Sequence, residues 1–539
     1  MHRSVLSGTT TTAVFRGESN SASANPDGEG EPSGGQTEGQ VGDHAQSIKA
    51  NSGTALVRLT ALLLAVLLFY AGWPGLSAPP GAFRPPLATI GNPKPILLAH
   101  FGFSLASVGD DLILIGVPYD NFYEGLGGGL GGSAYLVDTN GNLATTFTNP
   151  PQKLGDYFGH AVAALGTGRV LVSARLASVS ATNAGAVYLF NTNGTLLTTF
   201  TNMPVNMNDH FGDAVAGVGT DRVLVGAATG GTNNGGAAYL FATNGTLLRS
   251  FQNPTPQFLD FFGGSIAAVG NDLIVIGAYG DDTGGRDSGA AYLFNSTGAL
   301  LTTYTNPAPV AGGLFGWSVA GMGSDRILIG AEGNTVGGTN VGAAYLFATN
   351  GTVPATFTNP TLTRGGSFGH SLATVGGDRV LIGAFLNDIG AGKTGAAYLF
   401  DTNGTPLATF ANPTPEASTG PGSGGVPPTT DRFGFAVTAL GNDLFVIAAD
   451  GDNGGAPGAG SVYIYGVPRQ PPLGISANAS SVSLRWAGPE PSFILQQSGW
   501  LNPTSVWSDV EESPQVNGPT NLVLQPLTTT NRFYRLRWP

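Results

Sequence analysis

The pair Phe-Gly recurs seven times in this chain, and each copy is followed about 30 residues later by Ala-Tyr-Leu-Phe or a close variant. The pairs begin at Phe101, Phe158, Phe211, Phe262, Phe315, Phe368 and Phe433, and the matching tyrosines are Tyr135, Tyr188, Tyr239, Tyr292, Tyr345, Tyr398 and Tyr463. Successive copies lie 51 to 57 residues apart, except for a last step of 65. A long, fixed period of this kind indicates a repeat architecture.

Each repeat contains four short apolar runs, which we name strands A to D. In the third copy they cover residues 211–218, 223–227, 237–241 and 247–251. The runs are rich in Val, Ile, Leu, Phe and Tyr, are bounded by Gly, Asn, Asp or Pro, and are too short for a helical stripe, so we expect strands. Most copies carry Asn-Gly between C and D, at Asn193, Asn244, Asn350 and Asn403. This pair favours a type I′ hairpin turn.

Four-stranded units placed in series leave exposed terminal edges, and closing the series into a ring removes them. Strand A is rich in Gly, Ala and Ser, as expected beside a crowded axis. The seventh copy lacks strand D, but residues 86–95 closely repeat the strand D sequence that begins at Pro406. We therefore predict an all-β fold, in which a seven-bladed β-propeller spans residues 86–466 and the N-terminal strand completes the last blade.

These repeats resemble the FG-GAP propellers found in the head of integrin α chains and in many secreted bacterial proteins. The likeness rests on seven registered copies of Phe-Gly-x-Ser/Ala-Val-Ala followed by Gly-Ala, and it covers most of the chain. It implies an extracellular binding or adhesion role. Many members also carry an Asp-x-Asp-x-Asp-Gly calcium loop between strands A and B. The present connections, such as 109–111 and 219–221, are too short to supply the six to eight oxygens that calcium prefers.

The amino-acid composition limits the classes of partner that this chain can bind. The chain has no cysteine, so it forms neither a disulfide nor a thiolate metal site. Its net charge of −12 argues against nucleic-acid binding, which needs a basic face. Residues 57–78 pair Arg58 with a short apolar run and end in Leu-Ser-Ala, a pattern typical of a signal peptide. We expect a secreted or cell-surface protein, with membrane attachment only if this segment is not cleaved.

The two ends of the chain differ from the repeats. Residues 1–56 are polar and aperiodic, so we expect them to be disordered or to be an extension that is not translated, with a start at Val57. Residues 473–539 contain short alternating or apolar runs separated by Pro, Asn and Gly. We interpret this tail as a small, fibronectin-like β-sandwich.

Three features of the sequence could suggest a catalytic or metal-binding site. Residues 390–394 look like the end of a phosphate loop, but a strand follows where a helix is required. Residues 369–373 faintly suggest a nucleophile elbow, yet other copies hold varied residues in the same columns. The histidines at 100, 160, 210 and 370 fall in two columns of different copies, so we interpret them as packing or rim residues. We therefore expect no enzyme and no catalytic residue.

Acidic residues in the B-to-C loops are the candidates for cation binding. Carboxylates and turned carbonyls are ligands that calcium uses, although Asp and Gly also simply make turns. The candidate residues are Asp281, Asp282, Asp287, Asp450 and Asp452. No loop shows full ligand spacing, so we expect no obligatory cofactor and keep Ca²⁺ as an alternative.

The connections differ between the two faces of the predicted ring. The A-to-B and C-to-D turns are short and nearly identical, whereas the B-to-C and D-to-A connections vary, as expected for binding loops on a rigid scaffold. Aromatic and basic residues, the usual anchors of an interface, are the candidate ligand-binding residues. They are Tyr119, Phe122, Tyr123, Arg175, Phe258, Arg286, Phe385 and Lys393. We predict a non-enzymatic module that recognises an extracellular protein or glycan; the alternatives are a propeller hydrolase or lyase acting on extracellular polysaccharide and a structural surface-layer component.

Overall fold

The computed structural model describes residues 12–14, 45–46, 64–66, 85–120, 131–150, 155–179, 181–202, 206–336, 339–362, 364–387, 389, 394–415, 430–466, 473–478, 480–487, 494–498, 507–517, 520–526 and 532–537. The chain divides into two compact units. One is Pro79–Val467, and the other combines Met1–Ala78 with Pro468–Pro539. Each unit is described below by itself. No helix among the described residues is long and apolar enough to cross a membrane.

The described part of Pro79–Val467 contains seven four-stranded antiparallel sheets, and we call each sheet a blade. Blades 1 to 3 are β5 (Ser104–Val108), β6 (Leu112–Val117), β7 (Ser133–Asp138) and β8 (Leu143–Thr148); β9 (Phe158–Ala164), β10 (Arg169–Ala174), β11 (Ala186–Asn191) and β12 (Leu196–Phe200); and β13 (Phe211–Val218), β14 (Arg222–Ala227), β15 (Ala237–Ala242) and β16 (Leu247–Gln252). Blades 4 and 5 are β17 (Phe262–Val269), β18 (Leu273–Ala278), β19 (Ala290–Asn295) and β20 (Leu300–Thr305); and β21 (Phe315–Met322), β22 (Arg326–Ala331), β25 (Ala343–Ala348) and β26 (Ala355–Thr358). Blades 6 and 7 are β27 (Leu372–Val375), β28 (Arg379–Ala384), β29 (Ala396–Asp401) and β30 (Pro406–Ala411); and β31 (Phe433–Leu440), β32 (Leu444–Ala449), β33 (Ser461–Gly466) and β4 (Ala88–Gly91).

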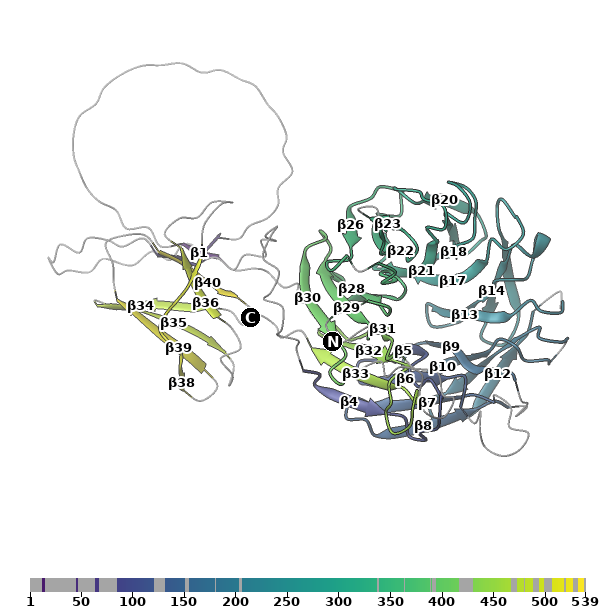
Figure 1. Ribbon diagram of the computed structural model, residues 1–539, viewed down its shortest axis with the longest axis horizontal. Helices are drawn as coiled ribbons and strands as arrows, with labels where there is room; N and C mark the ends of the chain where they lie inside the picture. The colour runs from purple at the N-terminus through teal and green to yellow at the C-terminus, as the bar shows by residue number, and fades with distance from the viewer. Residues whose placement is uncertain are drawn as a thin grey trace, which may run out of the picture. The chain divides into compact units, whose positions relative to one another are not determined.

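The blades form a closed ring. The first strand of each blade contacts the first strand of the next, and β31 of blade 7 contacts β5 of blade 1. Figure 1 shows these first strands around the centre, with the fourth strands, such as β12 and β20, at the periphery. Only small additions interrupt the pattern in the described residues: the 3₁₀ turn η1 (Thr232–Asn234) and the pair β23 (Thr335–Val336) and β24 (Thr339–Asn340). The predicted all-β propeller fold is confirmed.

The N-terminal strand of residues 86–95 completes the last blade, as predicted. Strand β4 pairs antiparallel with β33, with Val462 opposite Ile90 and Tyr463 opposite Thr89. In Figure 1 the purple β4 lies beside the yellow-green β33. Ile90 is 3% exposed and joins an apolar cluster that spans blades 7 and 1. The two ends of the repeat region are therefore joined by main-chain hydrogen bonds, which remove two free strand edges.

The Phe-Gly pair has a specific backbone role. Its glycine has a φ of 88° to 99° in all seven copies, and the residue after it donates its N–H to the carbonyl of the residue before Phe over 2.9–3.2 Å. This is the geometry of a type II turn, which requires a positive φ at its third residue and hence favours glycine. The seven phenylalanines are fully buried between adjacent blades. The turn thus fixes Phe in the core and sends the side chains before and after the pair toward the ring axis.

The C-to-D hairpins differ from the predicted type I′ turns. Asn193, Asn244, Asn350 and Asn403 have no positive φ, whereas the glycine after each has a φ of 90° or 91°. In blade 2, Gly194 donates its N–H to Asn191, and the pairing register shifts between Leu189 and Phe190. This is a type I turn followed by a glycine bulge. The prediction of type I′ was wrong because a bulge allows the asparagine to keep a negative φ.

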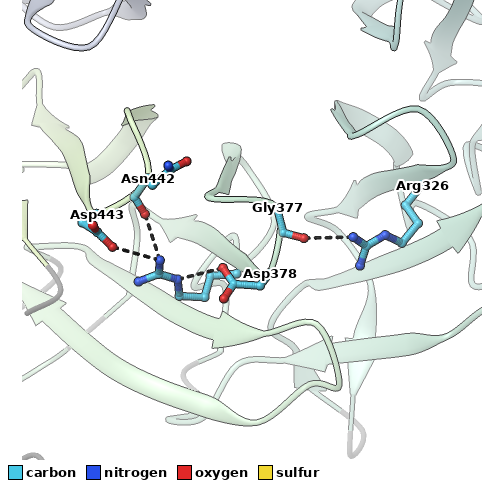
Figure 2. Close-up of polar contacts among 6 residues, drawn as sticks. Arg326, Gly377, Asp378, Asn442 and Asp443 are labelled. Atoms are coloured by element: carbon cyan, nitrogen blue, oxygen red, sulfur yellow. Dashed lines mark hydrogen bonds and ion pairs between the residues drawn. The ribbon is translucent and has the colours of Figure 1, made fainter. Parts of the chain in front are cut away.

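Arginines join neighbouring blades on the face with the A-to-B turns. Four blades begin strand B with Arg, and each of these side chains reaches the A-to-B turn of the next blade. Figure 2 shows one example, in which Arg326 donates to the carbonyl of Gly377 at 2.9 Å. The next arginine, Arg379, donates to the carbonyl of Asn442 at 2.8 Å. Arg379 also contacts Asp378 and Asp443 at 3.1 and 3.3 Å. These contacts hold the blades together at one end.

The second unit is also built from strands. One sheet has the order β34 (Gly474–Ala477), β35 (Ser481–Ala487), β39 (Thr520–Pro526) and β38 (Gln515–Asn517). The other has the order β2 (Ala45–Gln46), β1 (Thr12–Val14), β3 (Leu64–Val66), β40 (Arg532–Arg537), β36 (Ile494–Ser498) and β37 (Ser508–Asp509). Trp486 and Val523 of the first sheet share a core with Leu495 and Tyr534 of the second. Most of residues 1–78 lie outside the described residues, so disorder of 1–56 and a signal peptide at 57–78 remain predictions.

Candidate functional site

Side chains from every blade converge at the axis on the face that carries the B-to-C and D-to-A connections. They come from three columns: the residue before Phe-Gly, the residue after it, and the residues that follow strand B. We call this set the axial cluster. Its members are His100, Phe103, Tyr119, Tyr157, His160, Arg175, His210, Asp213, Phe261, Tyr279, Trp317, Glu332, His370, Phe385, Arg432, Phe435 and Asp450.

Contacts within the cluster run from blade to blade around the ring. Phe103 of blade 1 lies between His160 of blade 2 and Phe435 of blade 7, with ring centroids 5.2 Å from each. Phe435 lies 4.9 Å from His370 of blade 6, which lies 5.6 Å from Trp317 of blade 5. Neighbouring blades therefore place these side chains against one another at the axis.

Blade 4 fills its axial position in a different way. The residue after Phe-Gly is Gly264, and a Cβ there would lie 2.7 Å from the ring of Tyr279. Tyr279 follows strand B of the same blade, stacks on Phe261 at 4.8 Å and contacts Trp317 at 4.7 Å. The tyrosine ring thus occupies the space that a side chain at 264 would take, which continues the aromatic surface from blade 4 to blade 5.

Blade 1 adds a second aromatic group. Tyr119 contacts His100 at 5.1 Å, Tyr157 at 5.3 Å and Phe103 at 5.9 Å between centroids. Burial raises the pKa of Tyr119, and neighbouring Tyr157 adds to the rise. Tyr119 is therefore a neutral phenol at physiological pH and offers both a donor and an acceptor.

Blades 2 and 3 contribute the polar sector of the cluster. Arg175 Nη1 donates to Asp213 Oδ1 at 3.0 Å, and the Asp213 side chain is 9% exposed. Burial, together with the nearby Arg175 and His210, lowers the pKa of His160 to about 3. Burial also lowers the pKa of His210, although Asp213 opposes this. Burial raises the pKa of Asp213, and Arg175 opposes this rise. This sector therefore holds one Arg–Asp contact flanked by two imidazoles whose pKa is lowered.

One further ion pair and one carboxylate–imidazole contact complete the cluster. Buried Asp450 accepts from Arg432 at 3.1 Å and contacts His100 Nδ1 at 3.2 Å, while the Arg432 guanidinium lies 3.9 Å from the ring centroid of Phe435. His370 Nδ1 lies 2.7 Å from Glu332 and 3.1 Å from the indole nitrogen of Trp317. One ring nitrogen cannot donate to the carboxylate and accept from the indole together. The shorter contact favours donation to Glu332.

The predicted ligand-binding residues divide into three groups. Tyr119, Arg175 and Phe385 belong to the axial cluster, where Phe385 contacts His370 at 4.4 Å. Phe258 is 69% exposed in a D-to-A connection, and the side chain of Arg286 is 87% exposed beside Asp287. Neither of these two has a described contact with the cluster. Phe122, Tyr123 and Lys393 lie outside the described residues.

Most of the acidic residues predicted as calcium ligands form hydrogen bonds with other groups of the protein. Asp281 accepts from the hydroxyl of Tyr292 at 2.6 Å, and Asp452 accepts from that of Tyr463. Asp282 accepts from the backbone N–H of Asp287 at 2.8 Å. Among the described residues, no group of three or more His, Asp or Glu is placed to hold a metal ion. Asp281 and Asp452 thus contact the buried tyrosines of strand C, and Asp282 fixes its own loop. Calcium binding by these residues stays a prediction.

Sequence reasoning missed several members of the cluster. Phe103, Asp213, Trp317 and Phe435 occupy the column after Phe-Gly, and Arg432 occupies the column before it. The sequence signal that could have identified them is that the residue type at these two positions differs from blade to blade. The positions hold large or charged side chains, although the strands beside them consist mainly of Gly, Ala and Ser. Their convergence becomes visible only when the ring brings all blades to one axis.

Comparisons with known proteins agree with the repeat pattern. The FG-GAP repeat family model matches residues 152–190, 257–294 and 309–347. Among solved structures, the chain is similar to the C-terminal WD40 domain of Sif2, with 9% identity and a TM-score of 0.40, covering 72% of this chain and 100% of that one. It is also similar to the WD40 β-propeller domain of Doa1, with 10% identity and a TM-score of 0.43, covering 71% of this chain and 97% of that one. No curated protein matches. The chain thus carries FG-GAP repeats, matched at three positions, within a β-propeller of four-stranded sheets.

Proposed function

We propose that the protein is an extracellular, non-enzymatic binding module that recognises a protein or glycan through the face bearing the axial cluster. The observation that carries this proposal is the convergence of aromatic rings and ion pairs from all parts of the ring on one face. Half-buried aromatic and arginine side chains at the centre of a rigid surface are typical of binding hot spots.

The opposite face supports the assignment by contrast. Its turns are short and nearly identical, and its arginines are used in contacts between blades, as for Arg379 with Asn442. Residues that already hold neighbouring blades together are poor candidates for ligand binding. The variable connections and the axial cluster occur together on the other face, where a fixed scaffold can present different side chains to different parts of a partner.

The charged residues of the cluster are mutually paired rather than arranged as a nucleophile with its base. A general acid or base needs to reach a proton of the substrate, and each carboxylate here is engaged by a cation or an imidazole. We therefore favour binding without turnover. The extracellular setting is part of the proposal and follows from the signal-like segment at 57–78.

The test is to present the purified full chain to glycan and protein arrays and, in parallel, to chromogenic glycoside, ester and peptide substrates. We expect at least one saturable ligand and no turnover above the background of buffer. Turnover that Glu332→Gln abolishes would replace the binding module by an enzyme. Self-assembly into ordered layers with no ligand on either array would favour a structural surface component.

A further inference from the structure

The axial cluster is chemically divided, and the division restricts the class of ligand. Blades 4 to 7 and blade 1 contribute an aromatic arc that includes Phe261, Tyr279, Trp317 and Phe435. Blades 2 and 3 contribute the polar sector around Arg175. A ligand that binds over this cluster must therefore present an apolar surface and hydrogen-bonding groups together.

The charges of the site argue against a charged ligand. Arg175 is paired with Asp213, Arg432 with Asp450, and Glu332 with His370. The face of Phe435 that a ligand cation would use is taken by the guanidinium of Arg432 at 3.9 Å. An anion would meet three carboxylates within the cluster and a chain of net charge −12. A neutral ligand avoids the cost of breaking these pairs.

Hydrogen-bonding capacity nevertheless remains. The Arg175 side chain is 33% exposed, and its buried Nε–H has no hydrogen-bond partner among the described residues. Asp450 Oδ1 of blade 7 is likewise buried without a partner in the described ranges, although its other oxygen carries two contacts. A buried polar group without a partner costs free energy until a donor or acceptor reaches it. The ring of Tyr119 lies 5.1 Å from that of His100, which contacts Asp450 at 3.2 Å.

We propose that the axial cluster binds a neutral oligosaccharide, with pyranose rings packed on the aromatic arc and hydroxyl groups bonded to Arg175 and Tyr119. A pyranose has an apolar face of C–H groups and a rim of hydroxyls, each of which donates and accepts. Aromatic side chains supply large apolar contact area, and a few fixed polar groups supply orientation. This inference rests on the proposed binding function and narrows its ligand to one class.

Trp317 provides a direct probe, because it is the one tryptophan in the sequence between residues 79 and 467. The full chain is titrated with neutral hexaoses of β-1,4-glucan, β-1,3-glucan, mannan, xylan and chitin while tryptophan fluorescence is recorded. We expect a saturable change with at least one hexaose and no such change in Trp317→Phe, which keeps an aromatic ring in place. Polygalacturonate and an oligoarginine peptide serve as charged probes.

Binding is then measured by calorimetry in Arg175→Gln/Asp213→Asn, which removes the pair without leaving a buried lone charge. We expect at least tenfold weaker binding, whereas Thr195→Ala on the opposite face should bind as the wild type does, all variants having an unchanged circular dichroism spectrum. The inference is overturned if no neutral hexaose binds, if a charged probe binds more tightly, or if the double variant binds normally. A protein ligand lost in Trp317→Ala would overturn the saccharide alone and leave the proposed binding function intact.

Discussion

Closure of the ring by β4 predicts a sharp contrast between two residues only three positions apart. Ile90 is 3% exposed and packs with Val462 and Ile464 of its own blade and with Tyr135 and Val137 of blade 1. Leu87 belongs to the same segment but is 68% exposed. If the strand joins the two ends of the ring, Ile90→Ala opens a cavity between the first and last blades, whereas Leu87→Ala removes surface atoms.

The magnitude follows from burial. Replacing a buried Ile by Ala typically costs about 2–5 kcal/mol of unfolding free energy, and exposed substitutions usually change it by less than about 0.5 kcal/mol. With an unfolding entropy of about 2.1 cal/mol/K per residue, a unit of this size loses roughly 1.2 °C for each kcal/mol, so we expect a fall of about 2–6 °C for Ile90→Ala. For Leu87→Ala we expect a fall of less than about 1 °C by the same relation.

The assay is differential scanning calorimetry of the full chain at one fixed scan rate, supported by urea unfolding followed by circular dichroism. Deletion of residues 86–95 should lower the transition further and cause aggregation, because it exposes one strand edge, that of β33. Deletion of residues 473–539 should leave the propeller transition in place. Equal melting temperatures for Ile90→Ala, Leu87→Ala and the wild type would refute closure by this strand.

Three further predictions concern the axis, the blade contacts and cations. The pKa of His160 is about 3 in the folded protein and about 6.5 when unfolded, so the unfolded state binds more protons between these values and stability should fall as pH drops from about 6.5 toward 3. The variant His160→Phe carries the residue that blades 1 and 7 have at this column, and it should lose less stability than the wild type between pH 7 and pH 4. The free energy of unfolding in urea is measured at both pH values, and an identical loss in the two proteins would contradict the reasoning. Arg379→Leu, which places the residue of blades 1, 4 and 7 at its column, should cost about 1–2 kcal/mol in urea unfolding because contacts to Asn442 and Asp378 are lost; exposed Arg286→Leu is the control and should change little, and an equal effect of both would count against the blade contact. Chelation by EDTA should shift the melting temperature by less than about 1 °C, because the A-to-B loops lack the calcium ligand run and only a bound ion stabilises the fold by mass action. A drop of several degrees, abolished in Asp281→Asn, would reveal a calcium site.

The sequence predicted those features that depend on local pattern. The period of Phe-Gly and Ala-Tyr-Leu-Phe gave the strands of each blade, and the likeness of residues 86–95 to the strand beginning at Pro406 gave the pairing of β4 with β33. The hairpin type was missed because Asn-Gly also suits a type I turn with a bulge, and the choice depends on pairing register.

The axial cluster was predicted in part. Tyr119, Arg175 and Phe385 were identified as residues of variable loops, but their partners Phe103, Asp213 and Phe435 lie in strand A or beside it, in a column that otherwise reads as core. Asp281 resembles a calcium ligand in sequence because carboxylates beside glycines suit both loops and ions. Its contact with the hydroxyl of Tyr292 depends on packing between strands and is not visible in the loop itself.

The central claim is that recognition occurs on the axial face, and one comparison of affinities tests it most directly. The dissociation constant of the ligand found on the arrays is measured for the wild type, for Tyr119→Ala and Trp317→Ala in the axial cluster, and for Thr195→Ala and Thr246→Ala at the opposite hairpins. An anchor aromatic is typically worth about 2 kcal/mol or more, so we expect roughly thirtyfold weaker binding for the axial variants and unchanged binding for the hairpin variants. The reverse pattern, with all four variants folded, would contradict the account.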